Sequence, residues 1–470
     1  MTNPVGRCGL DPGHVLLLQA SLPGPQNRLV AKPLALPPLG LGYIASFLLL
    51  DGFEVRLSDM DVEDLGPEQL RDVLESFRPI VVGISTTTLT FKTALRIARC
   101  VRETLPGCLV CLGGPHVTVL PQDALRYDFV DAVVRGEGER TFLDLCRAVA
   151  GGASPPAETP GLVQRRDGVI LAGPDRNRIA NLDQVPFPAR HLMPLDRYNI
   201  PGTVATSRGC PFACGFCAGP VVLGRRHTAR TAENVLSEVQ TCVDLFGLTS
   251  FFFVDDTMTH DTRRLLEICE GLERVKIPQE LGRELKWTCE SRADSVNPEI
   301  LQEMRRAGCT SIQFGMESGS QELLDRLGKR VTLRQIEDAV IWSLDAGMSP
   351  LLSMVFPHPA ETEQTFRQTC DFIRRLIDLG VGKIAPSLLT LFPGTRFMDE
   401  REKLGLTLLT DDTDEYNLST PTLTTANLDI NTIANGYTQL LILTQHLRET
   451  EIDDMRPSEK QEIPPVGRPS

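Results

Sequence analysis

The chain has little positive charge and no long apolar segment. None of its 470 residues lie in an apolar run as long as the roughly 18 to 20 residues that a membrane helix needs. The longest candidate, YIASFLLLDGF, is too short and ends in Asp51 and Gly52. The N-terminus has no basic flank followed by an apolar core, so we expect no signal peptide, no membrane partner and a cytoplasmic protein. A net charge of −13 argues against a nucleic-acid partner, because phosphate binding needs clustered Lys and Arg.

Repeats and long low-complexity tracts are also absent. A length of 470 residues predicts two to four structural units. A composition of 41% hydrophobic and 23% charged residues is typical of a globular protein. The final segment, 456–470, is polar and rich in proline, which predicts a disordered tail.

The first 150 residues alternate apolar strand segments with helical ones. Such alternation predicts a parallel, doubly wound, Rossmann-like α/β domain over residues 1–150. The predicted strands are 14–21, 54–60, 80–88 and 108–118, and helices are expected at 39–53, 66–79 and 91–107. No G-x-G-x-x-G follows the first strand, which argues against a nicotinamide dinucleotide site.

Ligands of such sheets bind beyond the C-terminal ends of the strands. Glycines there let a backbone approach a ligand closely, and hydroxyls can donate hydrogen bonds. The candidate binding residues at these ends are Ser85, Thr86, Thr87, Gly113, Gly114, His116, Gly136 and Glu137. The alternative is that these residues only form tight turns of an α/β domain.

A second α/β series follows a Pro-rich, polar linker that we place at residues 151–200. Six strand segments separated by helices predict a partial (β/α)6 barrel over residues 201–400, with its chemistry at the C-terminal strand ends. These strands are 202–209, 250–256, 285–294, 311–320, 349–356 and 383–395. Residues 401–455 are expected to form a small helical region, including a helix at 432–447 that either packs against the barrel or covers it as a lid.

Three of the thirteen cysteines are clustered in the stretch SRGCPFACGFCAGP, at residues 207–220. Cys210, Cys214 and Cys217 have the spacing C-x3-C-x2-C, whereas the other cysteines are scattered and are expected to be buried, inert thiols. A zinc site would need a fourth ligand, often from a second pair, and no matching pair follows. Three thiolates on one loop suit a [4Fe–4S] cluster with one open iron. The remaining alternative is a chance grouping.

The stretch resembles the cluster loop of the radical S-adenosylmethionine (SAM) superfamily, in which the spacing C-x3-C-x2-C follows the first barrel strand. Phe216, the aromatic residue before the last cysteine, matches as well. The similarity continues through FFFVDD, SRAD, FGMESGS and LFPGT, and the front domain, with GGPHVT and VRGEGERTF, looks like the cobalamin (B12)-binding domain of one branch. It spans about residues 14–400.

This resemblance implies that the open iron binds SAM and that an electron from the cluster cleaves SAM to methionine and a 5′-deoxyadenosyl radical. It also implies that SAM is bound by the residues Phe216, Asp255, Asp256, Arg292, Glu317 and Ser318. The guanidinium of Arg292 would pair with the SAM carboxylate. The residues at the front-domain strand ends would bind cobalamin. The alternatives are a surface pair of Arg292 with Asp294, and Glu317 as a helix cap.

Two features depart from the family pattern. The segment FPHPAET at 356–362 stands where many relatives have a Gly-rich turn, so His358 is either a catalytic proton donor or substrate contact, or an exposed loop histidine. The front domain has no D-x-H-x-x-G, the motif that supplies a histidine ligand to cobalamin in other methyltransferases, and this leaves cobalamin binding open.

Three functions compete. The first is cobalamin-dependent methylation of a small molecule, such as an intermediate of antibiotic biosynthesis. The second is cobalamin-independent radical dehydration, deoxygenation or epimerisation of an aminoglycoside or sugar-like substrate. Both need an electron donor such as a flavodoxin, a ferredoxin or a dedicated reductase. The third is a non-enzymatic Fe–S redox sensor.

Overall fold

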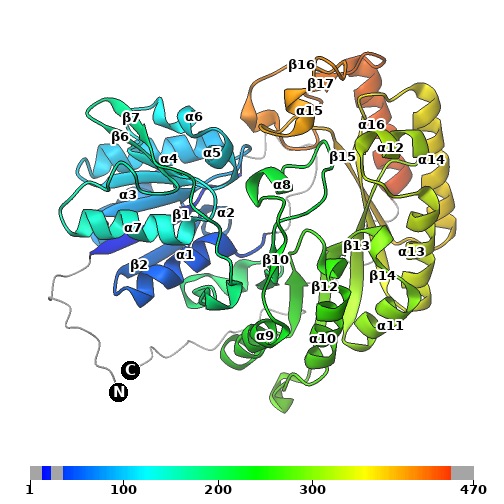
Figure 1. The fold of residues 1–470 in the computed structure, drawn as a ribbon, viewed down its shortest axis with the longest axis horizontal. Coiled ribbons are helices and arrows are strands. Elements are labelled where there is room, and N and C mark those ends of the chain that lie inside the picture. The colour runs from blue at the N-terminus through cyan, green and yellow to red at the C-terminus, as the bar shows by residue number, and fades with distance from the viewer. Residues whose placement is uncertain (1–12, 23–34, 446–470) are drawn as a thin grey trace. The chain divides into compact units, whose positions relative to one another are not determined.

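A computed structural model describes residues 13–22 and 35–445, which divide into two compact units (Figure 1). The first unit contains residues 40–178 and 186–193 together with the first strand, and the second contains residues 179–185 and everything described from 194 onward. Each unit is built around one large sheet.

The first unit has a seven-stranded sheet in the order β2-β1-β3-β4-β5-β6-β7. Strands β1 to β5 pair in parallel. The strands are β1 His14–Gln19, β2 Glu54–Asp59, β3 Val81–Ser85, β4 Leu109–Gly113, β5 Ala132–Val134, β6 Leu162–Arg166 and β7 Val169–Ala172. The helices are α1 Leu39–Leu50, α2 Met60–Glu63, α3 Pro67–Phe77, α4 Phe91–Thr104, α5 Pro115–Val119, α6 Pro121–Leu125 and α7 Gly138–Ala150.

Helices cover both faces of this sheet (Figure 1). Alternate strand residues such as Leu16 and Leu18 join the core formed with α3 and α4. On the other face, a Cβ at Gly83 would lie 2.6 Å from the ring of Phe142 in α7, so this helix packs directly on the strand. The predicted doubly wound α/β fold of the first domain is therefore confirmed.

Part of the segment predicted as a linker belongs to the first sheet. Strands β6 and β7 form an antiparallel hairpin, and β6 pairs with β5. Asp167 and Gly168 turn the chain with φ values of 50° and 77°. Asp-Gly between two apolar strands is a strong hairpin signal, so the pattern LVQRRDGVILA carried this information in the sequence.

The predicted strands begin at the right places but end too late. The segment 108–118 is strand only to Gly113, and helix α5 begins at Pro115. Gly114 lies between them with a φ of 104°, and a Cβ there would lie 2.5 Å from the carbonyl oxygen of Thr86. The chain leaves the sheet here because the ends of β3 and β4 approach too closely for any side chain at this position.

The second unit has a six-stranded parallel sheet in the order β15-β14-β13-β12-β11-β8. Its strands are β8 Gly202–Val204, β11 Ser250–Phe253, β12 Lys286–Ser291, β13 Cys309–Glu317, β14 Ser349–Phe356 and β15 Lys383–Leu388. The helices between them are α8 Gly219–Val222, α9 Ala232–Phe246, α10 Thr262–Leu272, α11 Pro298–Arg306, α12 Gln321–Leu327, α13 Leu333–Asp345 and α14 Glu363–Asp378. Each strand pairs with the next in the series, so the predicted partial (β/α)6 barrel is confirmed.

The barrel strands have one fully buried face and one partly exposed face. In β12, Trp287 and Cys289 are 1% and 2% exposed, whereas Thr288 and Glu290, which alternate with them, are partly exposed. The buried face meets the helices, since the indole of Trp287 donates to the carbonyl of Ala307 just after α11. The partly exposed face therefore lines the concave inner side of the barrel.

The region after the barrel is only partly helical. It contains the short helix α15 Arg396–Asp399, a two-stranded ribbon of β16 Thr407–Leu408 and β17 Leu423–Thr424, and helix α16 Ile430–Thr444. The predicted helix at 432–447 corresponds to α16, which packs against α14 and β15. The predicted tail at 456–470 lies outside the described residues. Within those residues, no helix is both long and apolar enough to cross a membrane.

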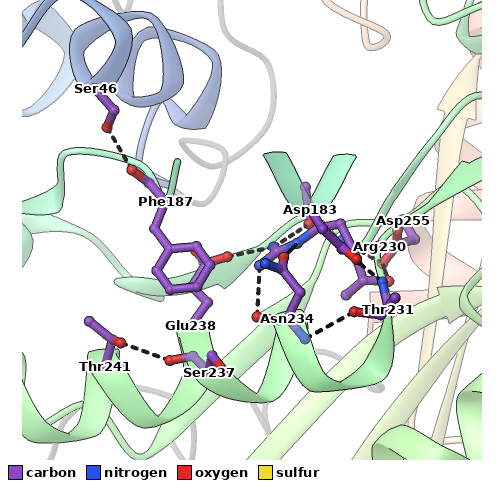
Figure 2. Close-up of polar contacts among 12 residues, drawn as sticks. Ser46, Asp183, Phe187, Arg230, Thr231, Asn234, Ser237, Glu238, Thr241 and Asp255 are labelled. Atoms are coloured by element: carbon purple, nitrogen blue, oxygen red, sulfur yellow. Dashed lines mark hydrogen bonds and ion pairs between the residues drawn. The ribbon is translucent and has the colours of Figure 1, made fainter. Parts of the chain in front are cut away.

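A buried ion pair joins the start of α9 to the barrel (Figure 2). The guanidinium of Arg230 lies 2.5 Å from the carboxylate of Glu238, and the two side chains are 6% and 1% exposed. Arg230 also donates to the carbonyl of Ala205, which follows β8, and to the side chain of Asn234. Removing one partner of such a pair leaves an uncompensated buried charge.

We therefore expect Glu238→Gln to lower the free energy of unfolding by about 3 kcal/mol. The matched control is Glu233→Gln on the exposed side of the same helix, for which a change below about 1 kcal/mol is expected. Urea unfolding followed by the circular dichroism of both variants measures the difference. Equal effects of the two substitutions would contradict a stabilising role of the buried pair.

Candidate functional site

The three clustered cysteines lie on one loop at the end of the first barrel strands. The loop runs from the short strand β9 Ser207–Arg208, which pairs with β10 Thr228–Ala229, to helix α8. Cys210, Cys214 and Cys217 are all partly exposed. Of the scattered cysteines that the structure describes, Cys370 is also partly exposed, and the others are buried, as expected: Cys100, Cys108, Cys111, Cys146, Cys242, Cys269, Cys289 and Cys309. Cys8 lies outside the described residues.

Backbone contacts fix the shape of this cysteine loop. The N–H of Cys210 donates to the carbonyl of Gly224, and the N–H of Phe397 donates to the carbonyl of Gly215, at 3.1 and 3.0 Å. A Cβ at Gly215 would lie 2.3 Å from the ring of Phe397, so only glycine fits between the loop and α15. Phe216 turns its ring toward Phe397, with centroids 6.5 Å apart, and so packs against the element that follows the barrel.

Burial controls the ionisation of the three thiols. It raises the pKa of Cys210 and Cys214, and raises that of Cys217 to about 11. The N–H of Gly219 donates to the sulfur of Cys217 at 3.4 Å. Among the described residues, no three His, Cys, Asp or Glu side chains are arranged as ligands of a single metal ion.

Asp255 anchors the start of the cysteine loop. Its carboxylate accepts hydrogen bonds from the hydroxyls of Thr206 and Ser207, at 2.8 and 2.5 Å, and the side chain is 2% exposed. Arg264 of α10 donates to the carbonyls of Thr206 and Arg230, at 2.9 and 2.7 Å. Figure 2 shows Asp255 beside Arg230. The resemblance implied that Asp255 binds SAM, but its carboxylate is engaged in holding the chain between β8 and the loop.

Asp256 is placed differently from its neighbour. It is exposed, and a Cβ at Gly219 would lie 3.3 Å from its carboxylate. Although the side chain reaches solvent, neighbouring atoms partly desolvate its carboxyl group, and this desolvation together with the charge of Asp255 raises the pKa of Asp256. Of the two carboxylates, Asp256 is therefore the one that lies beside the cysteines and faces solvent.

Arg292 connects the third barrel strand to the cysteine loop. Its guanidinium forms two parallel hydrogen bonds with Asp294, at 2.9 and 2.8 Å, and donates to the carbonyl of Lys329 at 2.6 Å. It also lies 3.8 Å from the ring centre of Phe212, between the first two cysteines. The expected pair with Asp294 is present. It is not a surface pair, because the side chain of Arg292 is only 7% exposed, and its guanidinium orders the cysteine loop.

Glu317 forms a buried ion pair that the sequence did not predict. Its carboxylate lies 2.5 Å from the ammonium group of Lys329, and the side chains are 8% and 6% exposed. The pair lies directly over the backbone of Gly315, where a Cβ would be 2.2 Å from the Lys329 nitrogen. Glu317 has a φ of 61°, a strained value for a residue with a side chain. Lys329 carries no recognisable motif, and only the fold brings it here.

Ser318 and His358 are buried beside Glu317. The hydroxyl of Ser318 contacts the hydroxyl of Thr369 at 3.2 Å and accepts from the N–H of Ser320, so it holds the turn after β13. His358 is 2% exposed, which corrects the expectation of an exposed loop histidine. Its Nε2 donates to the carbonyl of Glu317 at 3.1 Å, while Nδ1 has no hydrogen-bond partner among the described residues. His358 therefore supports the strained backbone of Glu317.

The candidate residues of the first unit fall into two groups. Ser85, Thr87, Gly113 and Gly136 are partly or fully exposed at the strand ends, and a Cβ at Gly136 would meet no atom within 4 Å. Glu137, next to them, is partly buried and lies 3.8 Å from Arg178. These residues therefore form an accessible surface at the C-terminal ends of β3, β4 and β5.

Three candidates of the first unit are part of the fold instead. Thr86 is fully buried and its hydroxyl bonds with Thr90, and Gly114 accommodates the close approach of the strands described above. His116 is 2% exposed, lies 3.3 Å from the Thr88 hydroxyl, and packs on Phe91 with ring centres 4.1 Å apart. Burial lowers its pKa.

The barrel helices also form a groove of about 550 Å³ between α14 and α16. It is lined by residues such as Phe366, Arg367, Cys370 and Gln439 on the outer, helical side of the barrel. Neither the three cysteines of the loop nor the candidate site residues at the strand ends line it.

Two family descriptions match the chain. The B12 binding domain matches residues 31–146, and the radical SAM superfamily matches residues 204–373. An uncharacterised methyltransferase of Pyrococcus horikoshii is 35% identical over 369 residues, covering 77% of this chain and 78% of the relative. The anaerobic magnesium-protoporphyrin IX monomethyl ester cyclase of Rubrivivax gelatinosus is 27% identical over 398 residues, covering 82% of this chain and 69% of the cyclase.

A solved structure shares the fold of the chain. The radical SAM methyltransferase TsrM from Kitasatospora setae, whose structure holds cobalamin and a [4Fe–4S] cluster, is 19% identical. It matches with a TM-score of 0.73 over 91% of this chain and 90% of TsrM. These matches identify an enzyme, so the alternative of a non-enzymatic redox sensor is wrong. The chain belongs to the radical SAM superfamily, in the branch of cobalamin-dependent, methyltransferase-like enzymes with an N-terminal B12-binding domain.

Proposed function

We propose that this enzyme cleaves SAM at a [4Fe–4S] cluster held by Cys210, Cys214 and Cys217, and that it methylates a small molecule with the help of cobalamin. The observation that carries the proposal is the placement of these three thiols. They are partly exposed on one loop at the end of the barrel strands, whereas eight of the nine other described cysteines are buried.

The donor groups of the loop fit such a cluster. Three thiols supply three iron ligands, and a [4Fe–4S] cluster with three thiolates keeps one iron for a further ligand. When bound, the cluster supplies the electron that divides SAM into methionine and a 5′-deoxyadenosyl radical. Because burial raises the pKa of all three thiols, cluster binding must release their protons.

Charged side chains of the barrel surround the second cysteine. The positive charges of Lys329 and Arg292 lower the pKa of Cys214, and the negative charge of Glu317 raises it, so all three lie near the loop. A guanidinium and an ammonium group favour the carboxylate of SAM, and a carboxylate favours its ammonium group. We assign SAM binding to Glu317, Arg292, Asp256 and Phe216. Asp255, Ser318 and His358 position the chain around them.

The methylation half of the proposal rests on the first unit and on the relatives. When bound, cobalamin supplies the methyl group that is transferred to the substrate. The open edge of the first sheet, with Ser85, Thr87, Gly113, Gly136 and Glu137, is where we place it. We also infer a one-electron donor, such as a flavodoxin, a ferredoxin or a dedicated reductase, and a reducing compartment such as the cytoplasm.

The cysteine assignment is tested with Cys214→Ala. After anaerobic reconstitution with iron and sulfide, the wild type should hold about four irons per chain. With SAM and dithionite it should form 5′-deoxyadenosine, and the variant should lose both properties. Cys370→Ala is the matched control, since Cys370 is a partly exposed cysteine in α14, outside the loop, and it should behave as the wild type. A variant that keeps cluster and nucleoside would refute the assignment.

The role of Glu317 is tested by SAM affinity. We expect Glu317→Gln to raise the Kd for SAM about tenfold, as for the loss of one charge-assisted hydrogen bond. Because this change leaves Lys329 unpaired, the double variant Glu317→Gln with Lys329→Met should restore thermal stability but not SAM affinity. Equilibrium dialysis of the reconstituted protein measures the Kd for SAM of both variants, and thermal melting measures their stability. Glu322→Gln on the surface is the control. An unchanged Kd in both variants would remove Glu317 from the SAM site.

A second candidate is a radical reaction without methylation, such as dehydration or epimerisation. The similarity to the magnesium-protoporphyrin cyclase supports this candidate, since the name of that relative describes no methyl transfer. Methylation consumes a second SAM, so it predicts S-adenosylhomocysteine beside 5′-deoxyadenosine, and cobalamin that remains with the protein through gel filtration. Quantifying both nucleosides during turnover discriminates the two reactions. Turnover with 5′-deoxyadenosine alone would favour the second candidate.

A further inference from the structure

The inner face of the barrel carries a carboxylate that forms no ion pair within the part of the chain that the structure describes. Glu290 lies near the end of β12, on the partly exposed side of the strand. Its neighbour Cys289 interacts with Cys309 and with Cys269 of α10, and therefore faces the helices. Because successive strand residues point to opposite faces, the side chain of Glu290 points into the barrel.

A carboxamide lies beside this carboxylate. Glu290 and Gln313 are direct partners in the register of β12 and β13, and both are partly exposed. Paired residues of neighbouring strands lie roughly 5 Å apart on the same face. Among the described residues, neither side chain has a hydrogen bond or ion pair, whereas the neighbouring Trp287 and Ser311 do. The two groups therefore offer acceptors and donors to a ligand.

The described side chains around Glu290 are polar, but none of them supplies a cation to it. Thr288 and Ser311 lie one step below on the same face, in register with each other. Arg292, two residues further along β12, is bound to Asp294, and Lys329 is bound to Glu317. Lys383 lies three strands away in the same row.

Electrostatics make this position favourable for a positive charge. Burial raises the pKa of Glu290, and the negative charge of Asp256 raises it further. Both effects mean that the ionised carboxylate lacks compensation in the protein alone. A ligand ammonium group between Glu290 and Gln313 would neutralise the carboxylate by a charge-assisted hydrogen bond.

We propose that Glu290 and Gln313 form a subsite that recognises a protonated amine of the substrate, so that the substrate class is a polar, amine-bearing small molecule. This inference rests on the proposed function, because it takes the barrel interior to hold the substrate. Glu290 lies one side-chain layer below the Glu317–Lys329 pair, since Gln313 precedes Gly315 by two residues on the same strand. The substrate amine thus binds deeper in the barrel than the groups assigned to SAM.

The test uses two sugars that differ by one group. Glucosamine carries an ammonium group where glucose carries a hydroxyl, and the ring is otherwise the same. Binding of each probe to the full-length, reconstituted protein with saturating SAM is measured by ligand-observed NMR titration. We expect glucosamine to bind at least about tenfold more tightly than glucose, as for a charge-assisted hydrogen bond.

The variant Glu290→Gln should abolish this preference and leave the affinity for glucose unchanged. Glu284→Gln, at an exposed position before the same strand, is the matched control and should keep the preference. Thermal melting checks the fold, and removal of an unpaired carboxylate should not lower the melting temperature.

Other outcomes would overturn the proposal. Equal or undetectable binding of the two sugars to the wild type would exclude an amine subsite. A higher Kd for SAM in Glu290→Gln, with the sugar preference kept, would assign Glu290 to the ammonium group of SAM. Formation of 5′-deoxyadenosine by the wild type is measured in the same samples, so that a failure of the SAM chemistry is seen separately from a failure of the subsite.

Discussion

The carboxylate of Asp255 is the group on which the site of the second unit depends. It binds the two hydroxyls at Thr206 and Ser207, where the chain leaves the first barrel strand and turns into the cysteine loop. Arg264 of α10 donates a hydrogen bond to the backbone carbonyl of the same Thr206. A loop rich in glycine and proline has no regular hydrogen-bond pattern of its own, so these buried polar contacts determine where its thiols lie.

The remaining anchors of the loop come from distant parts of the chain. Arg292 packs on Phe212, the carbonyl of Leu327 faces the N–H of Gly215, and Phe397 closes the other side. These anchors belong to the end of β12, to the end of helix α12 and to the segment after the barrel. The loop is therefore ordered by the completed barrel, and its chemistry is coupled to the stability of the whole unit.

Local patterns predicted the strands and helices well. The alternation of apolar runs and helical periodicity located both sheets. The strands of the first sheet are nearly continuous apolar segments, because they are buried on both faces, and the barrel strands have one fully buried face. Strand ends and the β6–β7 hairpin were missed. The ends depend on where neighbouring backbones meet, as at Gly114 and Thr86, and such meetings involve residues far apart in the sequence. The hairpin was missed because its Asp-Gly signal lies in a Pro-rich segment.

The residues of the candidate site also divide into those that a local pattern revealed and those that only the fold brings together. The cysteine spacing is a local pattern and was visible at once. The pair of Arg292 with Asp294 was also visible, since the two residues are neighbours in the sequence. The partners of Glu317 and His358 were not, since Lys329 and the carbonyl of Glu317 reach them only through the fold. An Asp-Asp pair in a sequence also cannot reveal that one carboxylate is buried in hydrogen bonds and the other is exposed.

The backbone of Gly315 has a consequence for how this enzyme can diversify. Any side chain at this position would have to displace the ends of Lys329 and Glu317, so a substitution here would disturb that ion pair. The layers below contain Thr288, Glu290, Ser311 and Gln313, which are all partly exposed. Substitutions that adapt the enzyme to a new substrate can therefore occur at these four positions without disturbing the Lys329–Glu317 pair. A mutant library is best confined to them.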